Sequence, residues 1–413
     1  MDIRITPSLL KGSVSVPSSK SITHRMLICA GLANGVSVIS GVSFSKDIYA
    51  TISAMQSMGA EYSINGNEIT VKGIGSKPSD SATVDCCESG STLRFLIPVA
   101  AVMGINAEFI GQGRLPQRPI TPYIRELSLK GIQFDYNNTM PFTINGKLKS
   151  GIYHLEGDIS SQFITGMLFS LPLADGDSEI IMTSPLQSKP YADMTVKCLE
   201  KFGVEISETH NGYFIRGNQK FTPCSSHVEG DYSQAAFFFV ANAIGNDITI
   251  NNLDDKSIQG DKKIVEIISE LCYNKKKNDK SVYCIDAENI PDLVPVLAVL
   301  SSLSGRQVRI TGIQRLKIKE SDRIISTADM INALGGNAVP YDDSMLINPV
   351  ENFIGGIVDG CGDHRIVMSA AVMATRAKAD VVILNADAVE KSYPDFFTDY
   401  NNIGGKANVI NVE

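Results

Sequence analysis

The fold is decided by the stretch Pro17-Ser18-Ser19-Lys20-Ser21-Ile22-Thr23-His24-Arg25, which comes directly before the apolar run at residues 26–30. Small hydroxyl residues before a periodic apolar run are typical of a helix N-terminus. The free backbone N–H groups and the dipole at such an end attract anions. Lys20 and Arg25 add two positive charges there, although a cap needs only one serine. The stretch therefore predicts a helix start that is also a candidate site for a phosphate or a carboxylate.

The same pattern recurs along the chain at intervals of about 60–70 residues, the length of a supersecondary unit. In each copy a polar helix start precedes an apolar helix, a stop and a short strand. A second helix follows, and most copies end in two short strands, with hairpin turns predicted at Asn65-Gly66 and Asn211-Gly212. Six units of this kind predict an α/β protein of the α+β type. The six helix starts lie at residues 21–25, 89–94, 160–163, 231–234, 290–292 and 362–365.

Six units divide naturally into three and three. The polar stretch at residues 217–226, which contains Pro223, is the predicted break. The first strand, at residues 3–6, is expected to pair with the second half of the chain. The predicted domains are therefore residues 14–222, and residues 1–13 together with 223–413. The first helix of each unit is apolar nearly all round and should be buried, with its positive end facing a cleft between the domains.

The composition of the chain limits the classes of function that we expect for it. The chain has 413 residues and a net charge of −8, which argues against a general nucleic-acid binder. No apolar stretch is long enough to cross a bilayer, and the N-terminus lacks a signal-peptide pattern, so we expect a cytoplasmic protein. Eight cysteines without a CxxC pair and five scattered histidines predict reduced thiols and no metal site.

The polar residues at the helix starts exceed what capping requires. Taken singly, Arg94 is typical of a structural ion-pair partner, residues 317–323 of a solvated helix start, and His364 of a capping histidine. Their shared position in the repeat favours one anion site instead, because arginine forks bind phosphates and carboxylates through two hydrogen bonds. Asp292 and Glu320 are the carboxylates available for proton transfer. The basic and polar candidates are Lys20, Arg25, Arg94, Arg118, Gln162, Arg323, His364, Arg365 and Lys391.

Nine stretches, which together cover essentially the whole chain, resemble the enolpyruvyl transferase family. Each stretch alone is weak evidence for the family, but nine stretches in the order found in the family are specific evidence. They are Pro17-Ser18-Ser19-Lys20-Ser21-Ile22-Thr23-His24-Arg25, Ser89-Gly90-Ser91-Thr92-Leu93-Arg94, Arg114-Leu115-Pro116-Gln117-Arg118-Pro119-Ile120, Gly157-Asp158-Ile159-Ser160-Ser161-Gln162-Phe163, Ser188-Lys189-Pro190-Tyr191, Ile290-Pro291-Asp292, Lys319-Glu320-Ser321-Asp322-Arg323, Gly362-Asp363-His364-Arg365 and Lys391-Ser392-Tyr393-Pro394-Asp395.

The resemblance implies a fold of two similar domains, each built from three βαβαββ repeats (an inside-out α/β barrel), with the active site in the cleft between them. It implies transfer of the enolpyruvyl group of phosphoenolpyruvate to the 5-hydroxyl of shikimate 3-phosphate, a step toward aromatic amino acids. No metal and no organic cofactor is implied. The expected partners are these two small molecules, with no nucleic acid or membrane, and the expected state is a monomer.

The resemblance also assigns residues, motif by motif. The implied catalytic residues are Asp292, Glu320, Lys20 and His364. Shikimate 3-phosphate would be bound by Lys20, Ser21, Arg25, Ser160, Ser161, Gln162, Ser188, Tyr191, Asp292, Arg315 and Lys319. Phosphoenolpyruvate would be bound by Lys20, Gly90, Arg118, Gln162, Arg323, Arg365 and Lys391. Arg315 is a departure, because the family often has Asn at this position.

Two alternatives remain open on the sequence. The first is transfer to UDP-N-acetylglucosamine by an enzyme of the same family. That enzyme typically has a cysteine in the loop corresponding to residues 111–119 and Lys-Asn in place of Lys20-Ser21, and this loop has no cysteine. The second is a non-catalytic anion-binding scaffold. A scaffold would be expected to have lost a proton-transfer residue, but Asp292 and Glu320 are both present.

Overall fold

The structure is a computed structural model that describes residues 1–75, 77–273 and 281–410. The chain forms two compact units, which we call unit 1 (Met1–Pro17 and Gly230–Glu413) and unit 2 (Ser18–Glu229). Both divisions lie a few residues after the predicted boundaries. The reason is strand pairing: β2 (Lys11–Ser15) pairs with β15 (Asp247–Asn251) in unit 1, and β14 (Ser225–His227) pairs with β3 (Val36–Ser40) in unit 2.

Unit 2 contains three four-stranded sheets, one for each of its repeats. In each sheet the first two strands are parallel, and a helix connects them in the second and third repeats; an antiparallel hairpin completes the sheet. In the first repeat, β14 from the end of the unit supplies the first strand. The remaining elements are α1 (Lys20–Leu32), α2 (Lys46–Ser57), β4 (Glu61–Asn65), β5 (Glu68–Lys72), β6 (Ser81–Asp85), α3 (Gly90–Met103), β7 (Asn106–Ile110), α4 (Thr121–Ser128), β8 (Gln133–Asp135), β9 (Phe142–Asn145), β10 (Ile152–Leu155), α5 (Ser161–Ser170), β11 (Ser178–Met182), α6 (Lys189–Lys201), β12 (Ile206–Thr209) and β13 (Gly212–Ile215).

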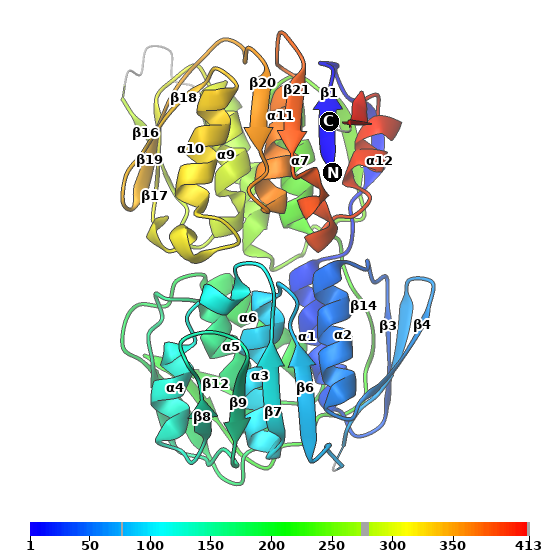
Figure 1. The fold of residues 1–413 in the computed structure, drawn as a ribbon, viewed down its shortest axis with the longest axis vertical. Helices are drawn as coiled ribbons and strands as arrows, with labels where there is room; N and C mark the ends of the chain where they lie inside the picture. The colour runs from blue at the N-terminus through cyan, green and yellow to red at the C-terminus, as the bar shows by residue number, and fades with distance from the viewer. Residues whose placement is uncertain (76, 274–280, 411–413) are drawn as a thin grey trace. The chain divides into compact units, whose positions relative to one another are not determined.

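Unit 1 repeats this scheme with two four-stranded sheets and the pair β15–β2 among its described residues. The N-terminal strand β1 (Asp2–Ile5) lies between β21 and β22, so the predicted pairing with the second half is confirmed. Figure 1 shows β20, β21 and β1 side by side. The other elements are α7 (Tyr232–Ala243), α8 (Ile264–Ile268), β16 (Tyr283–Asp286), α9 (Val294–Ser302), β17 (Val308–Thr311), α10 (Arg323–Ala333), β18 (Asn337–Pro340), β19 (Ser344–Asn348), β20 (Gly356–Asp359), α11 (His364–Ala374), β21 (Val381–Leu384), α12 (Phe396–Asn402) and β22 (Ala407–Ile410).

The first helix of each repeat lies in the core of its unit. Every residue of α9 and of α11 is buried, and α3 and α5 are buried over almost their whole length. In unit 1, α7, α9 and α11 contact one another. A helix that is apolar nearly all round has no face to offer to water, so the predicted burial is confirmed. The candidate site residues of these helices occur at or near the helix starts.

Candidate active site

The start of α1 is organised by its N-cap. Ser19 accepts a hydrogen bond from the backbone N–H of Ile22 through its hydroxyl, at 3.4 Å. Lys20 is the first helical residue, and its Nζ lies 2.8 Å from Oδ2 of Asp47 in the first turn of α2. The two side chains are mostly buried, so this ion pair fixes the position of the ammonium group.

Arg25 lies one turn further along α1 and is buried. Its Nε donates to Oγ1 of Thr195 at 2.9 Å, and its Nη2 donates to the carbonyl oxygen of Tyr191 at 2.9 Å. Nη1 donates back to the carbonyl oxygen of Ser21 at 2.7 Å. Burial lowers the pKa of Arg25 to about 10, so the guanidinium still carries its charge at neutral pH. The sequence-predicted residues Ser21, Arg25 and Tyr191 are thus brought together.

Gly90 opens α3 against the guanidinium of Arg118. A Cβ atom at position 90 would lie 2.5 Å from Nη1 and 2.8 Å from Cζ of Arg118. Arg118 is buried at the end of a 3₁₀ turn (Leu115–Gln117). Only glycine leaves room for this approach, so the pairing of Gly90 with Arg118 is built into the start of the helix.

Gln162 is held between α3 and α5. Its Oε1 accepts from Nη1 of Arg94 at 2.7 Å, and its Nε2 donates to Oγ of Ser91 at 3.0 Å. Arg94 is buried and lies with its guanidinium 5.1 Å from the centre of the Phe163 ring. Arg94 therefore positions Gln162, which fits the structural role typical of a lone arginine at a helix start.

Three serines lie at the starts of α5 and α6. Ser160 is the N-cap of α5, and its hydroxyl accepts from the backbone N–H of Gln162 at 3.3 Å. Ser161 is the first helical residue and is buried. Ser188 precedes α6 in the left-handed conformation, with a φ of 56°. A non-glycine residue with positive φ is uncommon and often occurs at functional sites.

In unit 1 the site residues converge on Arg323, which is almost completely buried at the start of α10. Its Nε lies 2.7 Å from Oδ2 of Asp363, its Nη1 lies 2.8 Å from Oδ1 of Asp292, and its Nη2 lies 2.7 Å from Oε2 of Glu320. One guanidinium therefore holds three carboxylates from three segments of the chain. These carboxylates keep the pKa of Arg323 well above its usual range, against the opposing effect of burial.

Asp292 lies between three cations. Besides Arg323, it accepts from Nη2 of Arg365 at 3.0 Å and lies 3.7 Å from Nζ of Lys319. Burial alone would raise the pKa of Asp292, but the charges of Arg365, Lys319 and Arg323 hold it well below its usual range. The carboxylate is therefore ionised at neutral pH. Burial lowers the pKa of Lys319 to about 8, so this amine gains and loses its proton near physiological pH.

The other predicted residues of unit 1 surround this group. Lys391 donates through Nζ to the carbonyl oxygen of Gly362 at 2.8 Å, just before α11. His364 is the first residue of α11 and is buried beside Arg365. Arg315 donates to the carbonyl oxygen of Glu288 through Nη2, which holds its guanidinium against the backbone. The departure at position 315 thus places an arginine where it contacts a neighbouring loop.

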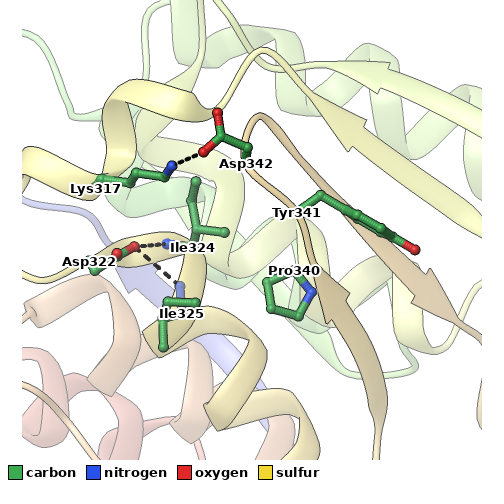
Figure 2. Close-up of a pocket in the computed structure, with 7 residues that line it drawn as sticks. All are labelled: Lys317, Asp322, Ile324, Ile325, Pro340, Tyr341 and Asp342. Carbon is green, nitrogen blue, oxygen red and sulfur yellow. Dashed lines mark hydrogen bonds and ion pairs between the residues drawn. The ribbon is translucent and has the colours of Figure 1, made fainter.

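A pocket of about 300 Å³ lies beside the segment that carries Lys319 and Glu320, and Figure 2 shows its lining. An ion pair joins Lys317 to Asp342 of the β18–β19 turn. Asp322 caps α10 by accepting from the backbone N–H groups of Ile324 and Ile325 at 3.2 and 3.3 Å. None of the pocket residues was assigned to a substrate, although Lys317 and Asp322 belong to the charged stretch 317–323 that the sequence singled out. These contacts hold the segment 317–322 on both sides of Lys319 and Glu320.

Several supporting residues were missed by the sequence interpretation. Asp47 pairs with Lys20, Thr195 orients Arg25, and Asp363 both pairs with Arg323 and caps α11 through the N–H of Arg365. Asp363 belongs to the motif Gly362-Asp363-His364-Arg365, so its position in the sequence could have identified it as a site residue. Asp47 and Thr195 lie in second helices of their repeats, and only tertiary contacts identify them.

The arrangement suits substrates with several anionic groups. Unit 2 presents the buried Arg25 and Arg94 near the starts of α1 and α3. Unit 1 presents the buried Arg323 and Arg365 at the starts of α10 and α11, with Asp292 and Glu320 both paired to Arg323. Within the ranges that the structure describes, no group of three His, Cys, Asp or Glu side chains is arranged to hold a metal ion. In the same ranges, no helix has both the length and the apolar character needed to cross a membrane.

Comparison with known proteins places this geometry in a family. The family model described as EPSP synthase (3-phosphoshikimate 1-carboxyvinyltransferase) matches residues 5–400. A Clostridium perfringens protein named 3-phosphoshikimate 1-carboxyvinyltransferase is 43% identical over 414 residues, covering 97% of this chain and 98% of its own. A Clostridium novyi protein of the same name is 42% identical over 424 residues, covering 98% of each chain.

A solved EPSP synthase structure from Acinetobacter baumannii has the same fold. It superimposes with a TM-score of 0.81 at 24% identity and covers 99% of this chain and 100% of its own. The predicted fold class, a mixed α/β fold of repeated βαβ units in two domains, is confirmed by this likeness. The chain belongs to the EPSP synthase (3-phosphoshikimate 1-carboxyvinyltransferase) family.

Proposed function

We propose that this chain transfers the enolpyruvyl group of phosphoenolpyruvate to the 5-hydroxyl of shikimate 3-phosphate and releases inorganic phosphate. The family match and the names of relatives about 40% identical over the full length support this function. The observation that carries it is the group around Arg323, in which one guanidinium holds both Asp292 and Glu320. The alternative acceptor UDP-N-acetylglucosamine is not favoured by these relatives.

We assign shikimate 3-phosphate to the hydroxyl-rich helix starts of unit 2 together with part of the carboxylate group of unit 1. Arg25, whose charge survives burial, supplies the cation, and serine hydroxyls supply donors that suit a phosphate and a polyhydroxylated ring. Lys319 adds an ammonium group beside Asp292. The proposed set is Lys20, Ser21, Arg25, Ser160, Ser161, Gln162, Ser188, Tyr191, Asp292, Arg315 and Lys319.

We assign phosphoenolpyruvate to the remaining arginines and lysines. This substrate carries a phosphate and a carboxylate, and arginine forks bind both groups through paired hydrogen bonds. Arg118 at Gly90, and Arg323 with Arg365, are buried and already oriented, so they lose little side-chain entropy on binding. The proposed set is Lys20, Gly90, Arg118, Gln162, Arg323, Arg365 and Lys391.

The chemistry proceeds by addition and elimination. In the addition, the 5-hydroxyl oxygen bonds to C2 of phosphoenolpyruvate while C3, its methylene carbon, takes a proton and becomes a methyl group. Glu320 is the proposed donor to C3, and Asp292 is the proposed acceptor of the hydroxyl proton. Lys20 and His364 assist proton transfer. In the elimination, the bond from C2 to the phosphate oxygen breaks, the methyl group returns a proton, and the C2–C3 double bond forms again.

Electrostatic preorganisation accounts for much of the proposed catalysis. The anionic tetrahedral intermediate carries the substrate phosphate and carboxylate, and the buried guanidinium groups stabilise it without rearranging. Binding has a cost, because the substrates compete with internal ion pairs such as Lys20 with Asp47 and Arg365 with Asp292. We also propose that the protein acts as a cytoplasmic monomer, which sedimentation of the purified chain would test for its oligomeric part.

The direct test is a phosphate-release assay with purified protein and phosphoenolpyruvate. We expect release with shikimate 3-phosphate and none above background with UDP-N-acetylglucosamine. Mass spectrometry should identify a product equal to shikimate 3-phosphate plus the enolpyruvyl group. Release only with the nucleotide sugar would contradict the proposed acceptor, and no release with either would contradict the proposed reaction.

A further inference from the structure

Asp261 is a buried carboxylate in unit 1 that the reaction scheme above does not use. It belongs to a short 3₁₀ turn (Gly260–Lys263), and only 3% of its surface is exposed. Its Oδ2 accepts a hydrogen bond from the hydroxyl of Ser233 in the first turn of α7. The N-cap of the same helix, Asp231, accepts from the backbone N–H groups of Ser233 and Gln234. A carboxylate is rarely this deeply buried unless it interacts with other polar groups.

The surroundings of Asp261 are those of the candidate active site. Helix α7 contacts the turn that carries Asp261, the turn that carries Asp292 (Pro291–Leu293) and helix α11, which carries Arg365. The charges of both Asp292 and Arg365 act on Asp261. Arg365 in turn donates to Asp292 at 3.0 Å. The guanidinium of Arg365 therefore interacts electrostatically with both Asp261 and Asp292.

We propose that Asp261 is a positioning residue for enolpyruvyl transfer, acting through Arg365 on Asp292. The inference rests on the proposed function. When Asp261 is ionised, it shares the positive charge of Arg365 and adds negative charge near Asp292. Both effects raise the affinity of Asp292 for a proton and make it a better base. When Asp261 is neutral, the positive charge of Arg365 is not shared with Asp261 and acts more strongly on Asp292. Asp292 then accepts a proton less readily.

The charge of Asp261 changes in the physiological range. Burial raises the pKa of Asp261 to about 7, with Asp292 and Asp231 acting in the same direction. Arg365 and the Ser233 hydrogen bond act in the opposite direction. Glu266, the charged residue of the neighbouring helix α8, is exposed to solvent. Turnover is therefore expected to rise as pH increases through about 7.

The first test compares the pH dependence of kcat in the unaltered enzyme, Asp261→Asn and the control Asp255→Asn, an exposed aspartate of the preceding loop. At pH 5.5 the three proteins should turn over at similar rates. Above pH 8 the Asp261→Asn protein should be about tenfold slower, because one pKa unit at the base corresponds to about a factor of ten. The KM for shikimate 3-phosphate should change much less than kcat. The control should keep the profile of the unaltered enzyme.

Ser233→Ala provides a second variant, which matters if Asp261→Asn does not fold. Loss of the hydroxyl removes a hydrogen bond to the ionised carboxylate, so the inflection in kcat should move to higher pH. A merely structural role for Ser233 would lower activity without moving the inflection. A Ser233→Ala profile with the original inflection would count against the proposal.

A measurement without turnover separates this inference from the proposed function. In protein labelled with ¹³C at aspartate carboxyl groups, the resonance that disappears in Asp261→Asn should titrate near pH 7. An unchanged kcat profile in Asp261→Asn, or a resonance that does not titrate between pH 5.5 and 8.5, would overturn the inference alone. No phosphate release by the unaltered enzyme, together with a normal titration, would instead overturn the proposed function.

Discussion

Gly90 and Arg118 approach each other so closely that a Cβ atom at position 90 would lie 2.5 Å from Nη1 of Arg118. Real side chains do not tolerate such a contact, so a larger residue at position 90 must displace the guanidinium. Gly90 thus fixes the position of Arg118, one of the cations proposed to bind phosphoenolpyruvate.

The first prediction follows from this contact. Gly90→Ala should raise the KM for phosphoenolpyruvate about tenfold, equivalent to about 1.4 kcal/mol, because Arg118 leaves its binding position. The KM for shikimate 3-phosphate should change little. Initial-rate kinetics with each substrate varied in turn would measure both constants.

Substitutions at two arginines of one loop, Arg118 and Arg114, test the role of the Arg118 guanidinium. Arg118→Lys should also raise the KM for phosphoenolpyruvate, since lysine cannot supply the two parallel donors of a guanidinium. Arg114→Lys alters an exposed arginine of the same loop and should leave the constant unchanged. Equal effects of the two substitutions would assign the loss to the loop rather than to the guanidinium.

The second prediction concerns proton transfer. Glu320→Gln and Asp292→Asn should each lower kcat by roughly 10²-fold or more, because each amide cannot donate or accept the required proton. Both variants keep an oxygen that can accept from Arg323, so far-UV circular dichroism should remain that of the unaltered protein. Glu351→Gln, at an exposed position, is the control. Turnover close to normal in both variants would reject the proposed catalytic roles.

The third prediction separates two contacts of the segment in Figure 2. Asp322→Ala removes the N-cap of α10 and should lower the free energy of unfolding by about 1 kcal/mol. It should also lower kcat, because Glu320 and Arg323 flank the cap. Asp342→Ala breaks an ion pair whose carboxylate is 73% exposed, and such exposed pairs contribute little to stability because water screens them. Urea denaturation and kcat measured on both variants would contradict this ranking if Asp342→Ala had the larger effect on each.

Sequence periodicity predicted much of the fold because each repeat contains its own start, stop and hairpin signals. The hairpin predicted at Asn65-Gly66 illustrates this, although its turn lies one residue later: Asn65 pairs with Glu68, and the two loop residues are Gly66, with a φ of 60°, and Asn67. The exchanged strands were harder to predict. β14 completes the sheet of the first repeat from almost 190 residues away, a pairing for which no local signal exists.

The candidate site was predicted unevenly for a similar reason. Arg323 and Asp292 stand in short motifs, so their residue types alone suggested a role. Thr195 contacts Arg25, and Asp261 contacts Ser233, only because segments far apart in the sequence pack together. A threonine inside a helix and an aspartate after a glycine are common, and neither pattern distinguishes a site residue from an ordinary surface residue.

The fourth prediction concerns stability at acidic pH and depends on His24. This side chain is buried, and its Nδ1 lies 2.7 Å from the hydroxyl oxygen of Thr51. Burial, and then the charges of Lys20 and Arg25, hold the pKa of His24 well below 6.5 in the folded protein. The unfolded chain takes up a proton at this residue below pH 6.5, and the folded chain does not. Stability should therefore fall as the pH decreases below about 6.5, by up to about 1.4 kcal/mol for each pH unit.

Comparison with a variant isolates this contribution, because many carboxylates also titrate in acid. In His24→Gln the free energy of unfolding, measured by urea denaturation, should fall less steeply between pH 6.5 and 5 than in the unaltered protein. His154→Gln, which alters an exposed histidine, should keep the original slope. Parallel slopes in His24→Gln and the unaltered protein would mean that His24 is protonated in the folded state, since only a proton bound equally in both states leaves the slope unchanged.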